Sequence, residues 1–168
     1  MEKRHLSRTD ECIDALIEDY GDMVYRLAFL YLKNKEDAED VFQDVFMKLF
    51  TVTAQFESTA QLKSYVATTT VNRCKNILRS VWRKRVDCTD EIEELCNFAD
   101  QSYTQREGEL VKEVLALPLK YRRVLYLHYY EGYQTAEIAK MLTLPSATVR
   151  TQLVRGRELL KKYINESE

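Results

Sequence analysis

The chain has 168 residues, of which 45% are hydrophobic, and a formal net charge of −2 at pH 7. No apolar run approaches the roughly 20 residues that cross a bilayer, and the first residues, MEKRHLSRTDEC, lack the apolar stretch of a signal peptide. We therefore expect a cytoplasmic protein without membrane insertion. Only four glycines and two prolines occur, which favours long helices over short strands.

Residues 1–86 are predicted to form one helical domain. Apolar side chains recur at helical spacing from Cys12 to about Asn34, again from Lys35 onward, and again from about Ala60 to Trp82. The last of these segments contains the run ATTTV, whose β-branched residues disfavour an isolated helix. That helix should therefore need support from the rest of the domain.

The second predicted helix has one apolar stripe and one polar face. The stripe consists of Ala38, Val41, Phe42, Val45 and Leu49. Four side chains are expected to project away from this stripe, and they place acidic and amide groups beside an apolar phenylalanine. They are Asp40, Gln43, Asp44 and Phe46. Such a face suits a protein partner better than DNA. The alternative is a solvated acidic face with a partly exposed phenylalanine.

The third predicted helix carries a polar and basic stripe opposite its apolar side. Its members, at i, i+4, i+7 and i+11, are Asn72, Asn76, Arg79 and Arg83, with Lys75 beside them. Tyr65 and Trp82 could stack on bases, but we expect both to serve in packing.

Residues 87–109 are predicted to be an exposed acidic linker, since they hold eight acidic residues and one basic residue and have little periodicity. They separate the first domain from a second one at 110–168. Charge is segregated along the whole chain: the net charge is +6 over residues 57–86 and +4 over 110–168, but −5 over 1–56 and −7 over 87–109. Only two segments are therefore suited to a polyanion.

The second domain contains the spacing of a helix-turn-helix: a short helix in QTAEIAKML, a tight turn at Thr143 and Leu144, and a longer helix. Ala139 is small enough for the two helices to cross closely. The polar side chains near the start of the longer helix suit base edges and phosphates, and they are Thr148, Arg150, Thr151, Gln152 and Arg155. The alternative is a helical bundle whose basic face is only solvated.

The cysteine and histidine pattern predicts neither a metal site nor a cofactor. The four cysteines include no CxxC pair, and both histidines lie far from any pair of them in sequence. Reduced, inert thiols are expected, with a redox pair between Cys88 and Cys96 as the alternative. No Ser/His/Asp or Cys/His arrangement is visible, so we do not expect an enzyme.

Three motifs together resemble the bacterial sigma-70 superfamily of transcription initiation factors. The segment LPLKYRRVLYLHYYEGYQTAEIAKMLTLPSATVRTQLVRGRELL resembles region 4 of that family. The segment DAEDVFQDVFMKLF resembles the part of region 2 that grips RNA polymerase, and VNRCKNILRS resembles its promoter-melting helix. The likeness covers roughly residues 12–86 and 108–163, without regions 1.1 or 3, as in the extracytoplasmic-function (ECF) subgroup.

The resemblance implies an all-α fold of two small helical domains, region 2 at 1–86 and region 4 at 110–168, joined by the linker at 87–109. It also implies a sigma factor that binds core RNA polymerase, directs it to minus-10 and minus-35 promoter elements and promotes DNA opening. The subgroup usually has an anti-sigma partner.

The resemblance further implies roles for the residues named above. Asp40, Gln43, Asp44 and Phe46 would bind the clamp helices of the largest polymerase subunit, and region 4 would bind the flap of the second. Asn72, Lys75, Asn76 and Arg79 would meet the minus-10 element, and the loop from Phe56 to Gln61 would hold a flipped base. Thr148, Arg150, Thr151, Gln152 and Arg155 would meet the minus-35 element.

Three residues depart from the family pattern. Gln134 stands where Ser or Thr often caps the supporting helix, and Thr143 where Gly often makes the turn, which puts the stability of these helix ends in doubt. Gln152 stands where Arg is frequent, which leaves the preferred promoter sequence open. A free-standing helix-turn-helix regulator is the alternative function.

Overall fold

The computed structural model describes residues 4–5, 10–52, 55–84 and 112–167. The chain divides into two compact units, residues 1–84 and 85–168. The all-α prediction is confirmed, with one addition: strands β1 (Arg4–His5) and β2 (Gln55–Phe56) form a short antiparallel pair in the first unit. The predicted linker at 87–109, with Cys88 and Cys96, lies outside the described residues, so its boundaries remain a prediction.

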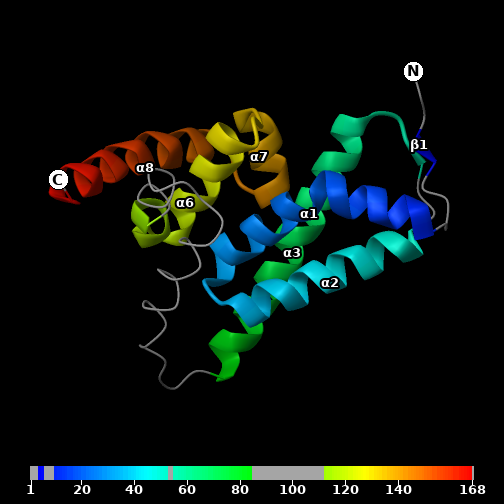
Figure 1. The fold of residues 1–168 in the computed structure, drawn as a ribbon. Helices are drawn as coiled ribbons and strands as arrows, with labels where there is room; N and C mark the ends of the chain where they lie inside the picture. Colours follow the sequence, from blue (N-terminus) through cyan, green and yellow to red (C-terminus); the bar gives the residue numbers. More distant parts are fainter. Residues whose placement is uncertain (1–3, 6–9, 53–54, 85–111, 168) are drawn as a thin grey trace. The chain divides into compact units, whose positions relative to one another are not determined.

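Three helices build the first unit: α1 (Asp10–Leu32), α2 (Lys35–Thr51) and α3 (Thr59–Lys84). Each packs against the other two, and they lie side by side in Figure 1. The spans agree with the predicted ones to within two residues at the predicted ends. The largest fully buried side chains of this core are Val24, Leu27, Val41, Val45, Leu49, Leu62, Val66 and Val71. Burial of each contributes about 1.5–3 kcal/mol relative to exposure.

The start of α2 is defined by local hydrogen bonding. The backbone N–H of Asp37 donates to Oδ1 of Asn34 at 2.9 Å. Glu36 and Asp37 lie in the first turn, where negative charge interacts favourably with the helix dipole. The chain can therefore leave α1 and begin α2 within a short connection.

The β-branched run of α3 lies in the core of the first unit. Thr69 and Thr70 are buried, and the hydroxyl of Thr70 donates to the carbonyl of Val66 at 2.8 Å. The expected tertiary support is thus present, because packing in the core compensates for the low helix propensity of this run. Cys74 is also fully buried and free, and burial raises the pKa of its thiol to about 12. Such a thiol stays protonated and unreactive at neutral pH.

The second unit contains a helical segment at 112–116, then α6 (Leu119–Leu125), the π-helical turn η1 (Tyr126–Tyr130), α7 (Thr135–Leu142) and α8 (Ser146–Ser167). Helix α8 packs against both α6 and α7. A Cβ added at Gly156 would lie 3.2 Å from Cδ1 of Leu125 and 3.2 Å from Cβ of Tyr121. The missing side chain therefore lets α6 approach α8 closely.

The turn between α7 and α8 forms at Thr143 although the residue there is not glycine. Thr143 adopts the left-handed conformation, with φ 57° and ψ 49°, and the N–H of Leu144 donates to the carbonyl of Ala139 at 2.9 Å. At the other end of α7, the N–H of Gln134 donates to Oε2 of Glu137 at 2.8 Å. Both ends of α7 have hydrogen-bond partners, at the cost of a β-branched residue in a conformation that favours glycine. None of the described helices has the length and apolarity to cross a membrane.

We expect Thr143→Gly to raise the free energy of unfolding by about 0.5–1 kcal/mol. An L-residue in the left-handed conformation costs about 1–2 kcal/mol, and the greater chain entropy of glycine offsets part of that gain. Urea denaturation followed by far-ultraviolet circular dichroism measures the change. The same replacement at Thr151, which is helical and exposed, should instead lower stability by a few tenths of a kcal/mol. A less stable Thr143→Gly variant would contradict the account.

Candidate protein and nucleic-acid interfaces

The polar side of α2 is exposed as predicted at three positions and differs at a fourth. Asp40, Gln43 and Asp44 are all exposed. The expectation that Phe46 projects from the surface is wrong: its side chain is only 6% exposed, and its ring centroid lies 4.7 Å from that of Phe42, itself only half-buried. Because α2 packs against both α1 and α3, its buried arc is wider than the single apolar stripe read from the sequence.

The most exposed apolar side chain on this side is Met47, which is 65% exposed, and Phe50, three residues later, is 38% exposed. Met47 follows Asp40 by seven residues and Gln43 by four, so helical periodicity places it on the same face. We call Asp40, Gln43, Asp44 and Met47 the α2 face. Sequence reasoning missed Met47, although its spacing from Asp40 was a usable signal.

One carboxylate of the α2 face is paired with α3. Nε of Arg73 donates to Oδ2 of Asp44 at 2.6 Å, and a second guanidinium nitrogen lies 2.5 Å from the same oxygen. The two side chains are 44% and 46% exposed, respectively. This ion pair connects the α2 face to the helix that carries the basic stripe.

The polar stripe of α3 is present in the structure. Asn72, Asn76 and Arg79 are exposed and form what we call the α3 stripe, while Lys75 is half-buried at its edge. The side chains of Arg83 and Trp82 are outside the described residues. An amide and guanidinium surface of this kind can donate to and accept from bases and phosphates.

The segment before α3 is held in place by packing and by a short hydrogen-bonded turn. Phe56 is 5% exposed, and its ring centroid lies 5.2 Å from that of Tyr65. This contact agrees with the packing role expected for Tyr65. The N–H of Glu57 donates to Oε1 of Gln61 at 2.7 Å, and the N–H of Gln61 donates to Oγ of Ser58 at 3.1 Å. The predicted base-holding loop therefore has a defined shape, with its polar residues exposed.

The predicted reading residues of α8 fall into two groups. Arg150, Thr151 and Arg155 are exposed, and the hydroxyl of Thr151 donates to the carbonyl of Ala147 at 3.0 Å. Thr148 and Gln152 are half-buried. Within the described part of the chain, Oε1 of Gln152 is buried without a hydrogen-bond partner.

Helix α8 also exposes an apolar side chain that sequence reasoning missed. Val154 is 45% exposed and lies three residues after Thr151 and four after Arg150, on the same side of the helix. The exposed side of the first turns of α8 thus combines cations, a hydroxyl and an apolar group. This is the set of groups that reads base edges and thymine methyls in a major groove.

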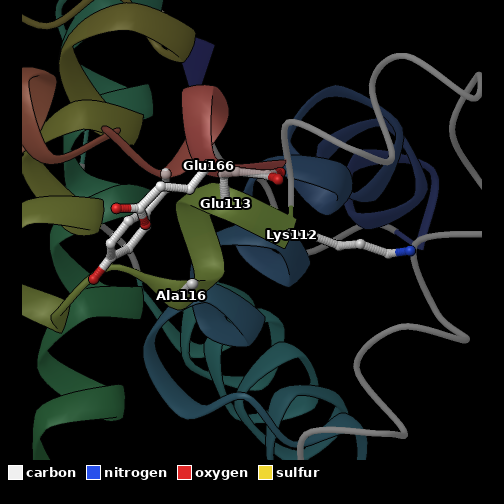
Figure 2. A pocket seen from close by; sticks show the side chains of 5 residues that line it. Lys112, Glu113, Ala116 and Glu166 are labelled. Atoms are coloured by element: carbon white, nitrogen blue, oxygen red, sulfur yellow. The ribbon is translucent and has the colours of Figure 1, made fainter. Parts of the chain in front are cut away.

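A separate pocket of about 350 Å³ lies between the 112–116 segment and the end of α8. It is lined by Lys112, Glu113, Ala116, Tyr163 and Glu166. Figure 2 shows Lys112 extending away from the other lining side chains. The lining contains none of the predicted site residues, and in the described ranges no group of three His, Cys, Asp or Glu residues could hold a metal ion.

Comparisons with known proteins agree with the order of these two units. The family model of Sigma-70 region 2 matches residues 16–84, and that of Sigma-70, region 4 matches residues 107–160. The RNA polymerase sigma factor SigV of Bacillus subtilis (strain 168) is 27% identical over 152 residues, covering 90% of this chain and 90% of its own. The ECF RNA polymerase sigma factor SigW of the same organism is 26% identical over 167 residues, covering 90% and 88%.

A solved structure has the same fold. The sigma factor RpoE from Bartonella quintana, determined in complex with the anti-sigma factor NepR, matches with a TM-score of 0.70 at 16% identity, over 90% of this chain and 96% of that one. The two family models together match most of the present chain, in the order of its two units. The chain therefore belongs to the sigma-70 family of RNA polymerase sigma factors, and within it to the ECF group.

Proposed function

We propose that this sigma factor uses three separate surfaces: the α2 face for core RNA polymerase, the α3 stripe for the minus-10 element, and the N-terminal half of α8 for the minus-35 element. The observation that carries the proposal is the chemistry of the α2 face. It places two carboxylates and an amide beside a methionine that is 65% exposed. Carboxylates repel a DNA backbone, whereas an apolar side chain with an acidic rim suits a basic protein surface.

The α2 face would bind the clamp helices of the largest polymerase subunit. Met47 would fill an apolar depression, and Asp40, Gln43 and Asp44 would bond to polar groups around it. Phe46 supports this surface from beneath, since its ring packs on Phe42 and shows only 6% of its surface to solvent. The second unit would bind the flap of the second polymerase subunit.

The α3 stripe would meet the minus-10 element as single-stranded DNA. Asn72 and Asn76 offer both donors and acceptors to unpaired bases, and Arg79, with Lys75 at the edge, offers positive charge to the backbone. A flipped base would sit at the loop from Phe56 to Gln61, where contacts to the extruded base offset the cost of unpairing. This is how the first unit would promote opening of the duplex.

The exposed side of α8 would read the minus-35 element. Arg150 and Arg155 would bind guanine or phosphate, Thr151 would bond to either, and Val154 would contact a thymine methyl. Thr148 and Gln152, which are half-buried at the edge of this exposed side, would make further contacts to the minus-35 element. Gln152 remains a proposed base reader, because an amide oxygen without an internal partner gains one when the side chain turns to a base edge.

We further propose that the chain acts in the cytoplasm, by binding and without a reaction of its own. Residues 87–109 would act as an acidic linker between a polymerase-binding first domain, 1–86, and a DNA-binding second domain, 110–168. An anti-sigma partner is proposed because the relative RpoE was solved in complex with the anti-sigma factor NepR.

Met47→Glu should weaken binding to core RNA polymerase at least tenfold, because a charge would have to be buried in an apolar contact. Titration of fluorescently labelled protein with core polymerase, followed by anisotropy, measures the affinity. Ala15→Glu introduces the same charge at an exposed position of α1 and should leave the affinity unchanged. Unaltered affinity of a folded Met47→Glu variant would exclude the α2 face as the docking site. Failure of the unmodified chain to bind polymerase would favour the free-standing regulator.

Arg155→Ala should lower the affinity of the holoenzyme for promoter DNA about tenfold, because one contact to a base or phosphate is lost. Footprinting should show loss of protection at the minus-35 element while protection at the minus-10 element remains. Lys161→Ala removes an exposed cation from the same helix, outside the proposed reading surface, and serves as the control. An unchanged upstream footprint for Arg155→Ala would refute the assignment.

A further inference from the structure

In the ion pair with Arg73, the carboxylate of Asp44 is already bound, although the proposed function requires it to bind polymerase. Asp44 belongs to the α2 face, yet its Oδ2 accepts from Nε of Arg73 at 2.6 Å. A carboxylate that docks on a protein partner needs a cation or donor of that partner. Docking through Asp44 must therefore either add a ligand to this pair or replace Arg73.

Arg73 also lies beside the α3 stripe. It follows Asn72 directly and precedes Asn76 by three residues, so it borders the stripe on the side that faces α2. Its side chain is 44% exposed, and its guanidinium is held by a single carboxylate oxygen. Once released from Asp44, the side chain can reach a ligand on the same surface as Asn72 and Asn76.

The exchange is energetically accessible because the pair is exposed. Ion pairs with both partners near half exposure typically change an equilibrium constant by only about twofold to fivefold. A polymerase cation in a less hydrated contact competes with Arg73 on favourable terms, and the displaced guanidinium then needs a new anion. Along the α3 stripe the available anion is a phosphate of the promoter strand, which Arg binds through several N–H groups.

We propose that Arg73 is a further DNA-backbone ligand of this protein, which Asp44 holds in the free chain and which passes to a promoter phosphate when Asp44 pairs with a cation of polymerase. The inference rests on the proposed function, in which the α2 face docks on polymerase and the α3 stripe meets the minus-10 element. It adds Arg73 to the proposed DNA-binding residues and couples polymerase binding to DNA binding. Docking on polymerase frees a cation for DNA that Asp44 neutralises in the free protein.

The first experiment measures affinity for core RNA polymerase by anisotropy for Asp44→Asn, Arg73→Gln and the double variant. Asp44→Asn should weaken binding. Arg73→Gln should tighten it about twofold to fivefold, because Asp44 no longer has to leave a partner. In the Asp44→Asn background, Arg73→Gln should have no further effect. If Arg73 merely held Asp44 in position for docking, Arg73→Gln would weaken binding, and the proposal would be overturned.

The second experiment measures promoter affinity of the holoenzyme over a range of salt concentrations. A plot of log affinity against log salt concentration has a negative slope. Arg73→Gln should make that slope less negative by about 0.7–0.9, the value for one lost phosphate contact. Tighter polymerase binding with an unchanged salt slope would overturn the transfer to DNA. The pair Lys35–Glu39, 3.8 Å apart and exposed on α2, provides the control: Lys35→Gln removes one charge from an ion pair outside the α2 face and should alter neither measurement.

The two proposals fail in different ways. If Asp44→Asn leaves polymerase affinity unchanged, the role of Asp44 in the α2 face is wrong. If Asp44→Asn weakens binding but Arg73→Gln does not tighten it, the α2 face stands and the exchange is refuted. Asp44 and Arg73 are nearly half-exposed and Lys35 is more exposed still, so circular dichroism and thermal unfolding of all variants should match those of the unmodified protein.

Discussion

The packing of α2 against two helices at once is the constraint on which the first unit depends. Contact with α1 on one side and α3 on the other buries a broad arc that includes both Val45 and Phe46. The opposite side of α2 remains exposed, and all of the α2 face lies on that side. Without the packing that buries Phe46, this aromatic ring would add to the exposed apolar surface of α2. The core of this unit thus determines which groups a partner can meet.

The second unit depends on close approach in a similar way. Gly156 allows α6 to come within van der Waals distance of α8, and the left-handed Thr143 turns the chain sharply enough for α7 to pack on α8 as well. With one side of α8 covered by these contacts, the opposite side exposes Arg150, Thr151, Val154 and Arg155. The strain at Thr143 is local and leaves this exposed side in place.

Charge explains how a slightly acidic chain can serve a DNA-directed function. The positive charge is concentrated at residues 57–86 and 110–168, and each of the two proposed DNA surfaces would offer only a few cations to a nucleic acid. Binding by either surface alone should be weak at physiological salt. Attachment to polymerase raises the effective concentration of both surfaces at the promoter. In the proposed exchange, polymerase also makes a single cation available to DNA. The guanidinium of Arg73 is neutralised by Asp44 until a partner competes for that carboxylate.

The sequence by itself determined the helical class, the helix spans to within about two residues at the predicted ends, the segregation of charge and the family, because periodicity, capping residues and motif order are local properties. It also identified Asp40, Asn72, Arg150 and Arg155 as exposed. Only the tertiary structure decided which aromatic ring of α2 is buried, that Met47 and Val154 are exposed beside the proposed polar surfaces, and that Asp44 pairs with Arg73. Those outcomes depend on how many neighbours cover a helix and on contacts between residues 29 positions apart, which no spacing within one helix specifies.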